Sequence, residues 1–369
     1  MTITKKCGRK TSKMKPKKRL LLILFAGLIA MIVAWQFVSD SFREEEKAVR
    51  KAFREMVQET FPEQSAQVSG SFGLRPFESP EGLPGNQQKP ARQVVLIHGV
   101  DDPGKVWMNL APALVEEGYT VWIMNYPNDQ PIADSSRLFF IELNKRAENG
   151  ITAIVIVAHS MGGLVSREML TNPEIDYAGQ IKPGSVPQVR GLIMVCTPNH
   201  GSEMARFRFI VEARDQYAHF AKGEGHWLRG ILDGAGEAKI DLLPGSRFLT
   251  ELNSRPHPQG VKMLVIAGVA APWSDEDIDN LIGYLETGET TSDGNTLEDL
   301  RAALHTTNRT LGDGLVTVDS TRLTGVPHMT LRGTHLSIIR NVTEGSDRIP
   351  PAVPIIIQEL GQQDFFGTG

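Results

Sequence analysis

The stretch AHSMGG at 158–163 has the composition of a catalytic turn, because it follows an apolar run at 154–157 and precedes a helical pattern. A serine at a sharp turn between a strand and a helix exposes its hydroxyl, and small residues two positions before and after it avoid clashes. Ala158 and Gly162 meet this requirement. The stretch predicts that Ser160 is a nucleophile. A helix start capped by Ser160 and packed through glycines is the alternative interpretation.

A second stretch, VVLIHGV at 94–100, reads as an apolar strand that ends in His98 and Gly99. Glycine permits a tight turn at that point. In a serine hydrolase, the loop after such a strand supplies one backbone N–H of the oxyanion hole, and the residue after the nucleophile supplies the other. The expected donors are therefore Val100 and Met161, and His98 is interpreted as a structural histidine.

With these two motifs the sequence resembles the α/β-hydrolase lipases and esterases. CTPNHGS at 196–202 looks like the Thr-Pro-x-x-Gly-Ser segment of lipases, and LLPGS at 242–246 is similar to lipase-like families that include the GPI inositol-deacylases. The resemblance covers about 92–360 and implies an α/β-hydrolase fold and a hydrolase, but no particular substrate. The sequence departs from the pattern in the alanine at 158, in the lack of a glycine run after His98, and in having no recognisable calcium site.

In the resembled fold an acid and then a histidine follow the serine along the chain. Asp313 lies in GDGLV at 312–316, where flanking glycines predict a tight loop that can point a carboxylate at an imidazole. Asp319 is the weaker substitute. Both His328 and His335 could act as a base, since an unperturbed histidine has a pKa of about 6.5. His335 is preferred because it follows the last expected strand.

These residues predict acyl transfer through a covalent intermediate. His335 would take the proton of Ser160, Asp313 would orient the imidazole, and the amides of Val100 and Met161 would hold the oxyanion. No metal or organic cofactor is required by this chemistry.

From about residue 92 the chain alternates short apolar runs with helical patterns, which predicts a mostly parallel sheet with helices on both faces. The expected strands cover 93–97, 120–124, 153–158, 191–195, 262–266 and 328–331, and the clearest helices cover 106–117, 133–148, 162–170 and 354–360. The predicted catalytic domain is 92–369. The interval 202–256 lacks a convincing strand and is interpreted as an insertion, either a substrate-covering cap or peripheral helices.

The N-terminal region has a different composition. Residues 1–19 contain nine Lys or Arg and no acid, whereas the rest of the 369 residues carries 30 basic and 43 acidic side chains. Nineteen uncharged residues at 20–38 are close to the ~20 that span a bilayer. They predict a transmembrane helix. A cleavable signal peptide is the alternative, but its apolar region is normally ~7–15 residues long.

Since Lys and Arg stay on the cytoplasmic side, the tail at 1–19 is expected inside the cell. The catalytic domain is then extracytoplasmic, on the periplasmic side of the inner membrane in a Gram-negative bacterium. The segment 39–91 is predicted to be a stalk helix at 42–61, ended by Pro62, and a linker at 63–91. The basic tail is interpreted as a topology signal rather than as a nucleic-acid site.

Two cysteines, Cys7 and Cys196, give no disulfide framework, and neither follows the apolar span as an acylated cysteine would. The sequence therefore predicts a membrane-anchored serine hydrolase that cleaves carboxylic esters of lipids or of other apolar molecules. It predicts no nucleic-acid partner and identifies no protein partner. Two alternatives stay open: an acyltransferase with the same triad, and a membrane-bound scaffold that retains the fold without the chemistry.

Overall fold

The computed structural model describes residues 42–78, 92–100, 104–147, 150–182, 185–204, 236–271, 275–287, 294–343 and 345–362. The basic tail expected at 1–19 and the membrane span expected at 20–38 lie outside these residues. Among the helices that are described, none is long and apolar enough to cross a bilayer.

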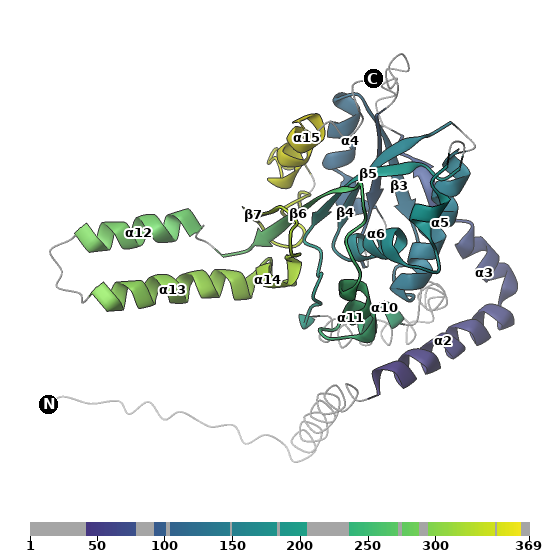
Figure 1. The fold of residues 1–369 in the computed structure, drawn as a ribbon, viewed down its shortest axis with the longest axis horizontal. Coiled ribbons are helices and arrows are strands. Elements are labelled where there is room, and N and C mark those ends of the chain that lie inside the picture. Colours follow the sequence, from purple (N-terminus) through teal and green to yellow (C-terminus); the bar gives the residue numbers. More distant parts are fainter. Residues whose placement is uncertain are drawn as a thin grey trace, which may run out of the picture. The chain divides into compact units, whose positions relative to one another are not determined.

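A seven-stranded sheet forms the centre of the fold (Figure 1). Its strands in spatial order are β1 (Gly73–Pro76), β3 (Tyr119–Asn125), β2 (Arg92–Ile97), β4 (Ala153–His159), β5 (Gln188–Val195), β6 (Lys262–Val269) and β7 (His328–Arg332). Strand β1 is antiparallel to β3, and every other pair is parallel. The prediction of a mostly parallel sheet is confirmed, and each of the six expected runs forms a strand.

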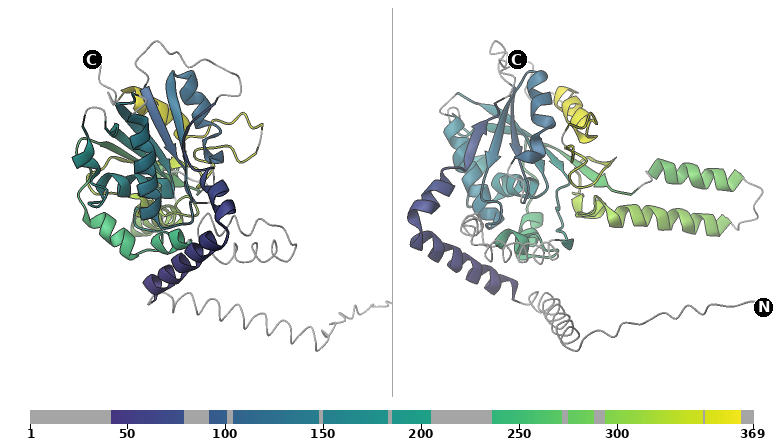
Figure 2. Two further views of the ribbon diagram at one scale, coloured as in Figure 1. Left: turned by 90° about the vertical axis from the view of Figure 1, so that its right-hand side faces the viewer. Right: turned by 180° about the vertical axis from the view of Figure 1, so that it is seen from behind.

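Helices cover both faces of the sheet (Figure 2). Neighbouring side chains of a strand point to opposite faces, so Val95 and Ile97 of β2 pack with α5 (Ile132–Ala147) and α6 (Met161–Thr171). Val94 and Leu96 belong to the other core, with α4 (Leu110–Glu116) and α15 (Ala352–Gln362). All four strand residues are fully buried, which stabilises the fold by about 1.5–3 kcal/mol for each side chain. This double burial explains why the runs contain almost no polar residues.

The first strand of the sheet comes from the segment that the sequence analysis assigns to a stalk and linker. Helix α2 (Arg43–Thr60) ends just before Pro62. A second helix, α3 (Pro62–Ser69), begins at that proline and is followed by β1. The backbone N–H of Leu74 in β1 donates to Glu142 of α5 at 3.2 Å. A four-residue strand that contains a glycine and a proline has no recognisable apolar pattern, so only its pairing with β3 identifies it. The catalytic sheet therefore begins before residue 92.

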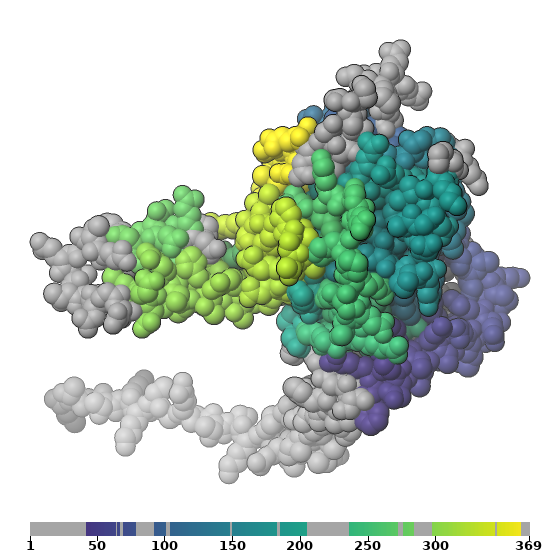
Figure 3. Space-filling model, in the orientation of Figure 1, coloured from purple at the N-terminus to yellow at the C-terminus, as the bar shows by residue number. Residues whose placement is uncertain are grey.

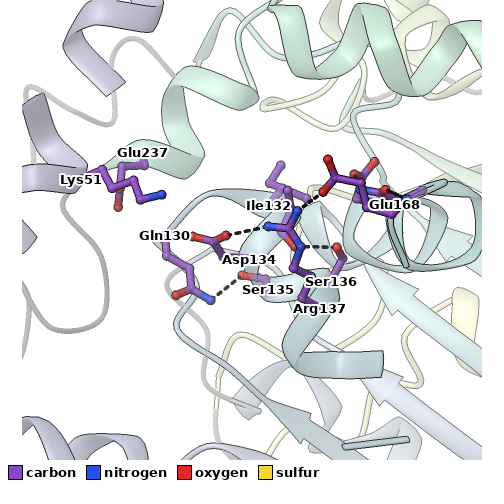
Figure 4. Close-up of polar contacts among 12 residues, drawn as sticks. Lys51, Gln130, Ile132, Asp134, Ser135, Ser136, Arg137, Glu168 and Glu237 are labelled. Atoms are coloured by element: carbon purple, nitrogen blue, oxygen red, sulfur yellow. Dashed lines mark hydrogen bonds and ion pairs between the residues drawn. The ribbon is translucent and has the colours of Figure 1, made fainter. Parts of the chain in front are cut away.

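The described end of the insertion at 202–256 contains helices α10 (Glu237–Asp241) and α11 (Arg247–Ser254). Arg54 of α2 is buried, and its guanidinium lies 3.2 Å from Glu237 of α10 and donates to Gln130 at 3.2 Å. Gln130 in turn donates to Ser135 at the start of α5 (Figure 4). A buried arginine requires such partners, because leaving its charge unpaired costs several kcal/mol. These contacts link α2 to α10 and to the start of α5.

Between β6 and β7 the described residues form three helices, α12 (Asp275–Thr287), α13 (Gly294–Leu311) and α14 (Val318–Thr321). Helices α12 and α13 form a pair that packs through Ile278, Ile282 and Leu297. In Figure 1 they extend past β7, and in Figure 3 their green surface projects on the same side of the view. Two shorter elements complete the described structure, the 3-10 helix η2 (Lys105–Trp107) and α7 (Tyr177–Gln180).

Candidate active site

Ser160 lies at the turn between β4 and α6, at the carboxyl edge of the sheet. Its backbone has φ 54° and ψ −129°, a region that L-residues avoid at a cost of about 1–3 kcal/mol. The turn is held by the N–H of Ser160, which donates to the carbonyl of Val195 in the neighbouring strand at 2.8 Å. This strained geometry presents the side chain of Ser160 to a pocket, as the spacing of small residues predicts.

The glycines after Ser160 are required by the close approach of α6 to the sheet. A Cβ atom on Gly162 would lie 2.2 Å from the carbonyl oxygen of Ile97, and one on Gly163 would lie 2.1 Å from Oγ1 of Thr197. Before the serine, Ala158 is fully buried and pairs with Ile97 of β2. The alanine at this position is therefore compatible with the tight turn.

The loop after β2 lies directly against the serine, because a Cβ atom on Gly99 would be 2.6 Å from Cβ of Ser160. Val100 lines the same pocket as Ser160. Met161 is the first residue of α6, so its N–H has no carbonyl partner within the helix. Val100 thus lines the pocket that contains Ser160, and the N–H of Met161 is available at the start of α6.

His98 does not take part in this pocket. It is buried, its Nδ1 lies 2.8 Å from the carbonyl oxygen of Gly99, and its ring stacks on Tyr126 with 4.6 Å between centroids. The hydroxyl of Tyr126 donates to the carbonyl of His98 at 2.5 Å. His98 therefore stabilises the loop, in agreement with its interpretation as a structural histidine.

Asp313 and His335 form a buried pair, with 2.7 Å between Oδ2 of Asp313 and Nδ1 of His335. The other carboxylate oxygen accepts the backbone N–H groups of Leu315 and Val316, each at 2.8 Å. Burial alone would raise the pKa of Asp313, but the charge and hydrogen bond of His335 and these two amides lower it below its usual value. The carboxylate is therefore ionised and fixed in orientation.

His335 also lines the pocket that contains Ser160. Because its Nδ1 faces Asp313, its Nε2 is the nitrogen left for a substrate or a serine hydroxyl. The backbone N–H of His335 donates to the carbonyl of Asp313 at 3.0 Å, which ties the two loops together a second time. Ser160 and His335 thus line one pocket, and His335 is hydrogen-bonded to Asp313.

The other candidates for the acid and the base, Asp319 and His328, lie outside this pocket. Asp319 is exposed on α14, where it lies 3.6 Å from Arg322. Nε2 of His328 lies 2.9 Å from the hydroxyl of Thr321, and burial together with the charge of Arg322 lowers the pKa of His328 to about 4. Neither residue lines the pocket at Ser160.

A residue that the sequence analysis does not single out also supports the base. His159 precedes the nucleophile, is almost fully buried, and has Nε2 2.8 Å from the carbonyl oxygen of His335. Its ring lies 4.7 Å from the ring of His335. Burial, with a smaller effect from the charge of His335, lowers the pKa of His159 to about 3, so the ring is neutral at pH 7 and donates through Nε2. Nothing in the local sequence shows this contact across 176 residues.

Cys196 completes the surroundings of the acid. Cys196, Asp313 and His335 each offer an atom that could bind a metal ion, and these three atoms lie within 4.8 Å of one another. Among the described residues, this is the cluster that could hold a metal ion. Burial and then the negative charge of Asp313 raise the pKa of the Cys196 thiol, so it is protonated and donates to Asp313. A metal ion would have to displace the protons of both the thiol and the imidazole. The donor set therefore suits an oriented carboxylate better than a metal centre.

The pocket beside Ser160 is mainly apolar. Its walls include Pro198 and Met204, Leu242 of the insertion, and Leu315 and Val316 of the loop that carries the acid. Lys239 is the cationic side chain of this lining, and its Nζ lies 3.4 Å from Asp129. An apolar pocket with a few polar groups at one point suits an apolar substrate with one reacting group.

The parallel sheet, the strained serine turn and the buried Asp–His pair define a protein of the α/β-hydrolase type. A family model described as "Alpha/beta hydrolase family" matches residues 94–329, more than half of the chain, and the chain belongs to that family.

A triacylglycerol lipase from Burkholderia plantarii is 26% identical over 151 residues. The match includes 38% of this chain and 39% of the lipase, so the chain spans about two fifths of that relative. The similarity to a lipase is therefore partial, whereas the family match covers most of the folded domain.

Several solved structures are similar in fold. The mature lipase BlEst2 of Bacillus licheniformis is 18% identical with a TM-score of 0.47, and the match covers 74% of this chain and 93% of the lipase. Phospholipase PlaB of Legionella pneumophila is 17% identical with a TM-score of 0.46, and the match covers 73% of this chain and 60% of PlaB. The lipase of Staphylococcus hyicus is 12% identical with a TM-score of 0.45, and the match covers 73% of this chain and 94% of that lipase.

Proposed function

We propose that this protein is a membrane-anchored serine hydrolase that cleaves carboxylic esters, with lipids as its substrate class. The observation that carries the proposal is that Ser160, in its strained turn, and His335, held at 2.7 Å by Asp313, line one pocket. The family and the partial match to a triacylglycerol lipase support an ester as the reacting group. The apolar pocket lining supports an apolar acyl group.

The reaction proceeds in two halves. In the first, Nε2 of His335 takes the proton of Ser160, the serine oxygen attacks the ester carbonyl, and the N–H groups of Val100 and Met161 stabilise the oxyanion. The protonated His335 then gives its proton to the leaving alcohol, and an acyl-serine remains. In the second half, water loses a proton to His335 and attacks the acyl-serine, which releases the acid and restores Ser160.

The first experiment is labelling with an active-serine phosphonate probe, together with hydrolysis of p-nitrophenyl butyrate. Wild type is expected to be labelled and active. Ser160→Ala should lose both labelling and turnover while its thermal unfolding stays unchanged, since a small residue is acceptable at the turn. Labelling that persists in Ser160→Ala would show that another residue is the nucleophile, and an unlabelled wild type would favour the non-catalytic scaffold. Analysis of products in the presence of an acceptor alcohol separates hydrolysis from acyl transfer.

We also propose that the catalytic domain is held outside the cytoplasm by a helix at 20–38, with the tail at 1–19 inside. The basic tail directly before nineteen uncharged residues supports this topology. External protease should digest the domain in cells with a permeabilised outer barrier and leave the tail intact. Protection of the domain would reverse the orientation, and a soluble mature form starting near residues 35–40 would favour a cleaved signal peptide.

The insertion at 202–256 is proposed to be a substrate-covering cap rather than a group of peripheral helices. It contributes Ser202, Met204, Lys239 and Leu242 to the lining of the pocket beside Ser160. Leu242→Ala should therefore lower kcat/KM more for an octanoyl ester than for an acetyl ester. Equal losses for the two esters would favour the peripheral interpretation.

A further inference from the structure

A second cavity, of about 380 Å³, lies between α13, α14 and strands β6 and β7. It shares no lining residue with the pocket beside Ser160. Val269 of β6 and Thr330 of β7 form part of its wall, and the charged or titratable side chains of the remaining lining are three arginines, one histidine and one glutamate. None of the chemistry proposed for Ser160 uses this cavity.

One face of α13 supplies most of the positive charge. Arg301, His305 and Arg309 follow one another at intervals of four residues, which places them on the same side of the helix. Arg322, directly after α14, lines the cavity from a different element. Three guanidinium groups and an imidazole thus gather around one space.

The carboxylates near these groups are mainly exposed. Arg301 lies 3.4 Å from Asp279 and 3.5 Å from Glu298, and Arg322 lies 3.6 Å from Asp319. The side chains of these three acids are 56%, 70% and 72% exposed, respectively. Such pairs contribute about 0–1 kcal/mol each, so a stronger anion can replace them.

Arg309 differs from the other arginines, because no carboxylate of the described residues lies within ion-pair distance of it. Asp279 also faces His305, with 3.1 Å between its Oδ1 and Nε2 of the imidazole. The lining itself therefore holds three arginines against the single carboxylate of Glu298.

We propose that this cavity is a binding site for a phosphate group, either as free inorganic phosphate or as part of an anionic lipid headgroup. Guanidinium groups match phosphate oxygens with paired, charge-assisted hydrogen bonds, and several of them from different elements surround a tetrahedral anion better than a planar one. The hydroxyl of Thr330 adds a neutral donor to the wall.

The position of the cavity gives its occupant an influence on the catalytic loops. Helix α13 ends two residues before Asp313, and β7 ends three residues before His335. A phosphate that bridges Arg309 of α13 and the β7 wall holds together the elements that lead into the acid and the base. Its binding should slow hydrogen exchange at the amides of Leu315 and Val316, whose N–H groups orient Asp313.

The site is tested by thermal unfolding of the full chain in a non-ionic detergent, in a Ser160→Ala background so that lipid is not consumed. Inorganic phosphate is titrated against chloride at equal ionic strength. Phosphate should raise the unfolding temperature. The double variant Arg309→Gln/Arg322→Gln should need about a hundredfold more phosphate for the same rise, since each of the two charged hydrogen bonds lost costs about tenfold in affinity. Glu298→Gln removes a negative charge from the lining, so this variant should need less phosphate than the parent for the same rise in unfolding temperature.

The matched control is Arg247→Gln, which removes an exposed arginine of α11 that pairs with Glu251 at 2.6 Å. It should respond to phosphate like the parent.

A second titration uses detergent micelles that contain phosphatidylglycerol or, as the neutral comparison, phosphatidylcholine. A larger response to phosphatidylglycerol than to phosphate identifies a lipid headgroup as the source, and the reverse identifies the free anion. Equal responses of the parent and the double variant in both titrations would overturn the proposal. Because the readout is unfolding, the outcome does not depend on ester hydrolysis.

Discussion

Replacement of the acid, Asp313→Asn, tests the geometry of the candidate site most directly. One carboxylate oxygen of Asp313 accepts two backbone N–H groups at 2.8 Å, and the other accepts Nδ1–H of His335 at 2.7 Å. An asparagine must keep its carbonyl oxygen toward the two backbone donors. Its NH₂ group then faces Nδ1, which becomes the acceptor, and the imidazole proton moves to Nε2. The nitrogen available to Ser160 is then no longer a base.

The expected loss follows from this wrong tautomer. In an Asp–His–Ser arrangement such a change lowers turnover by roughly 10⁴-fold, or about 5.5 kcal/mol in the activation free energy. The fold should be retained, because the amide preserves the bonds from Leu315 and Val316. The loss should therefore appear in kcat with little change in the free energy of unfolding.

The assay is initial-rate hydrolysis of p-nitrophenyl butyrate, with urea unfolding as the measure of stability. Asp319→Asn is the matched control, since Asp319 is exposed and pairs only with Arg322 among the contacts described. It should keep nearly all of the activity. Comparable rates for wild type and Asp313→Asn, or a large loss in Asp319→Asn, would refute the assignment of Asp313 as the orienting acid.

Three further predictions concern the base, the turn and the buried histidine beside it. His335→Ala should be as damaging as Ser160→Ala, and the double variant should lose little more, because residues that act as one unit are not additive; an additive loss measured in kcat would separate their roles. Gly162→Ala should lower the free energy of unfolding by about 1–3 kcal/mol or more, because its Cβ would meet backbone oxygen at 2.2 Å. Gly283→Ala is its control: a Cβ there meets nothing within 4 Å, so the change should stabilise helix α12 by about 0.5–1 kcal/mol, and equal effects of the two changes in urea unfolding would contradict the packing argument. His159 has a folded pKa of about 3 against an unfolded value of about 6.5, so the unfolded chain binds its proton first and stability falls as pH drops below about 6.5. Between pH 7.5 and 5.0 wild type should lose about 2 kcal/mol more than His159→Gln in urea unfolding, and equal losses would show that His159 does not titrate as described.

The sequence determined those features of the fold and site that depend on local pattern. Continuous apolar runs identify buried parallel strands because both faces of each strand are covered, and all six expected runs form strands. The turn at Ser160 is recognisable because small residues must stand at fixed positions around it. The order of serine, acid and histidine then reduces the candidates for the other two roles to a few residues.

Only the tertiary structure decided between candidates and revealed contacts over long distances in the chain. Asp313 differs from Asp319 because a loop buries it against His335, whereas Asp319 stays on an exposed helix. Strand β1 has too few residues for a periodic signal and exists through its pairing with β3. The contact of His159 with the backbone of His335 joins parts of the chain that are distant in sequence, and the arginines of α13 share a cavity wall with Val269 of β6. Local sequence carries no signal for such contacts, because they arise when the sheet brings the carboxyl ends of its strands to one edge.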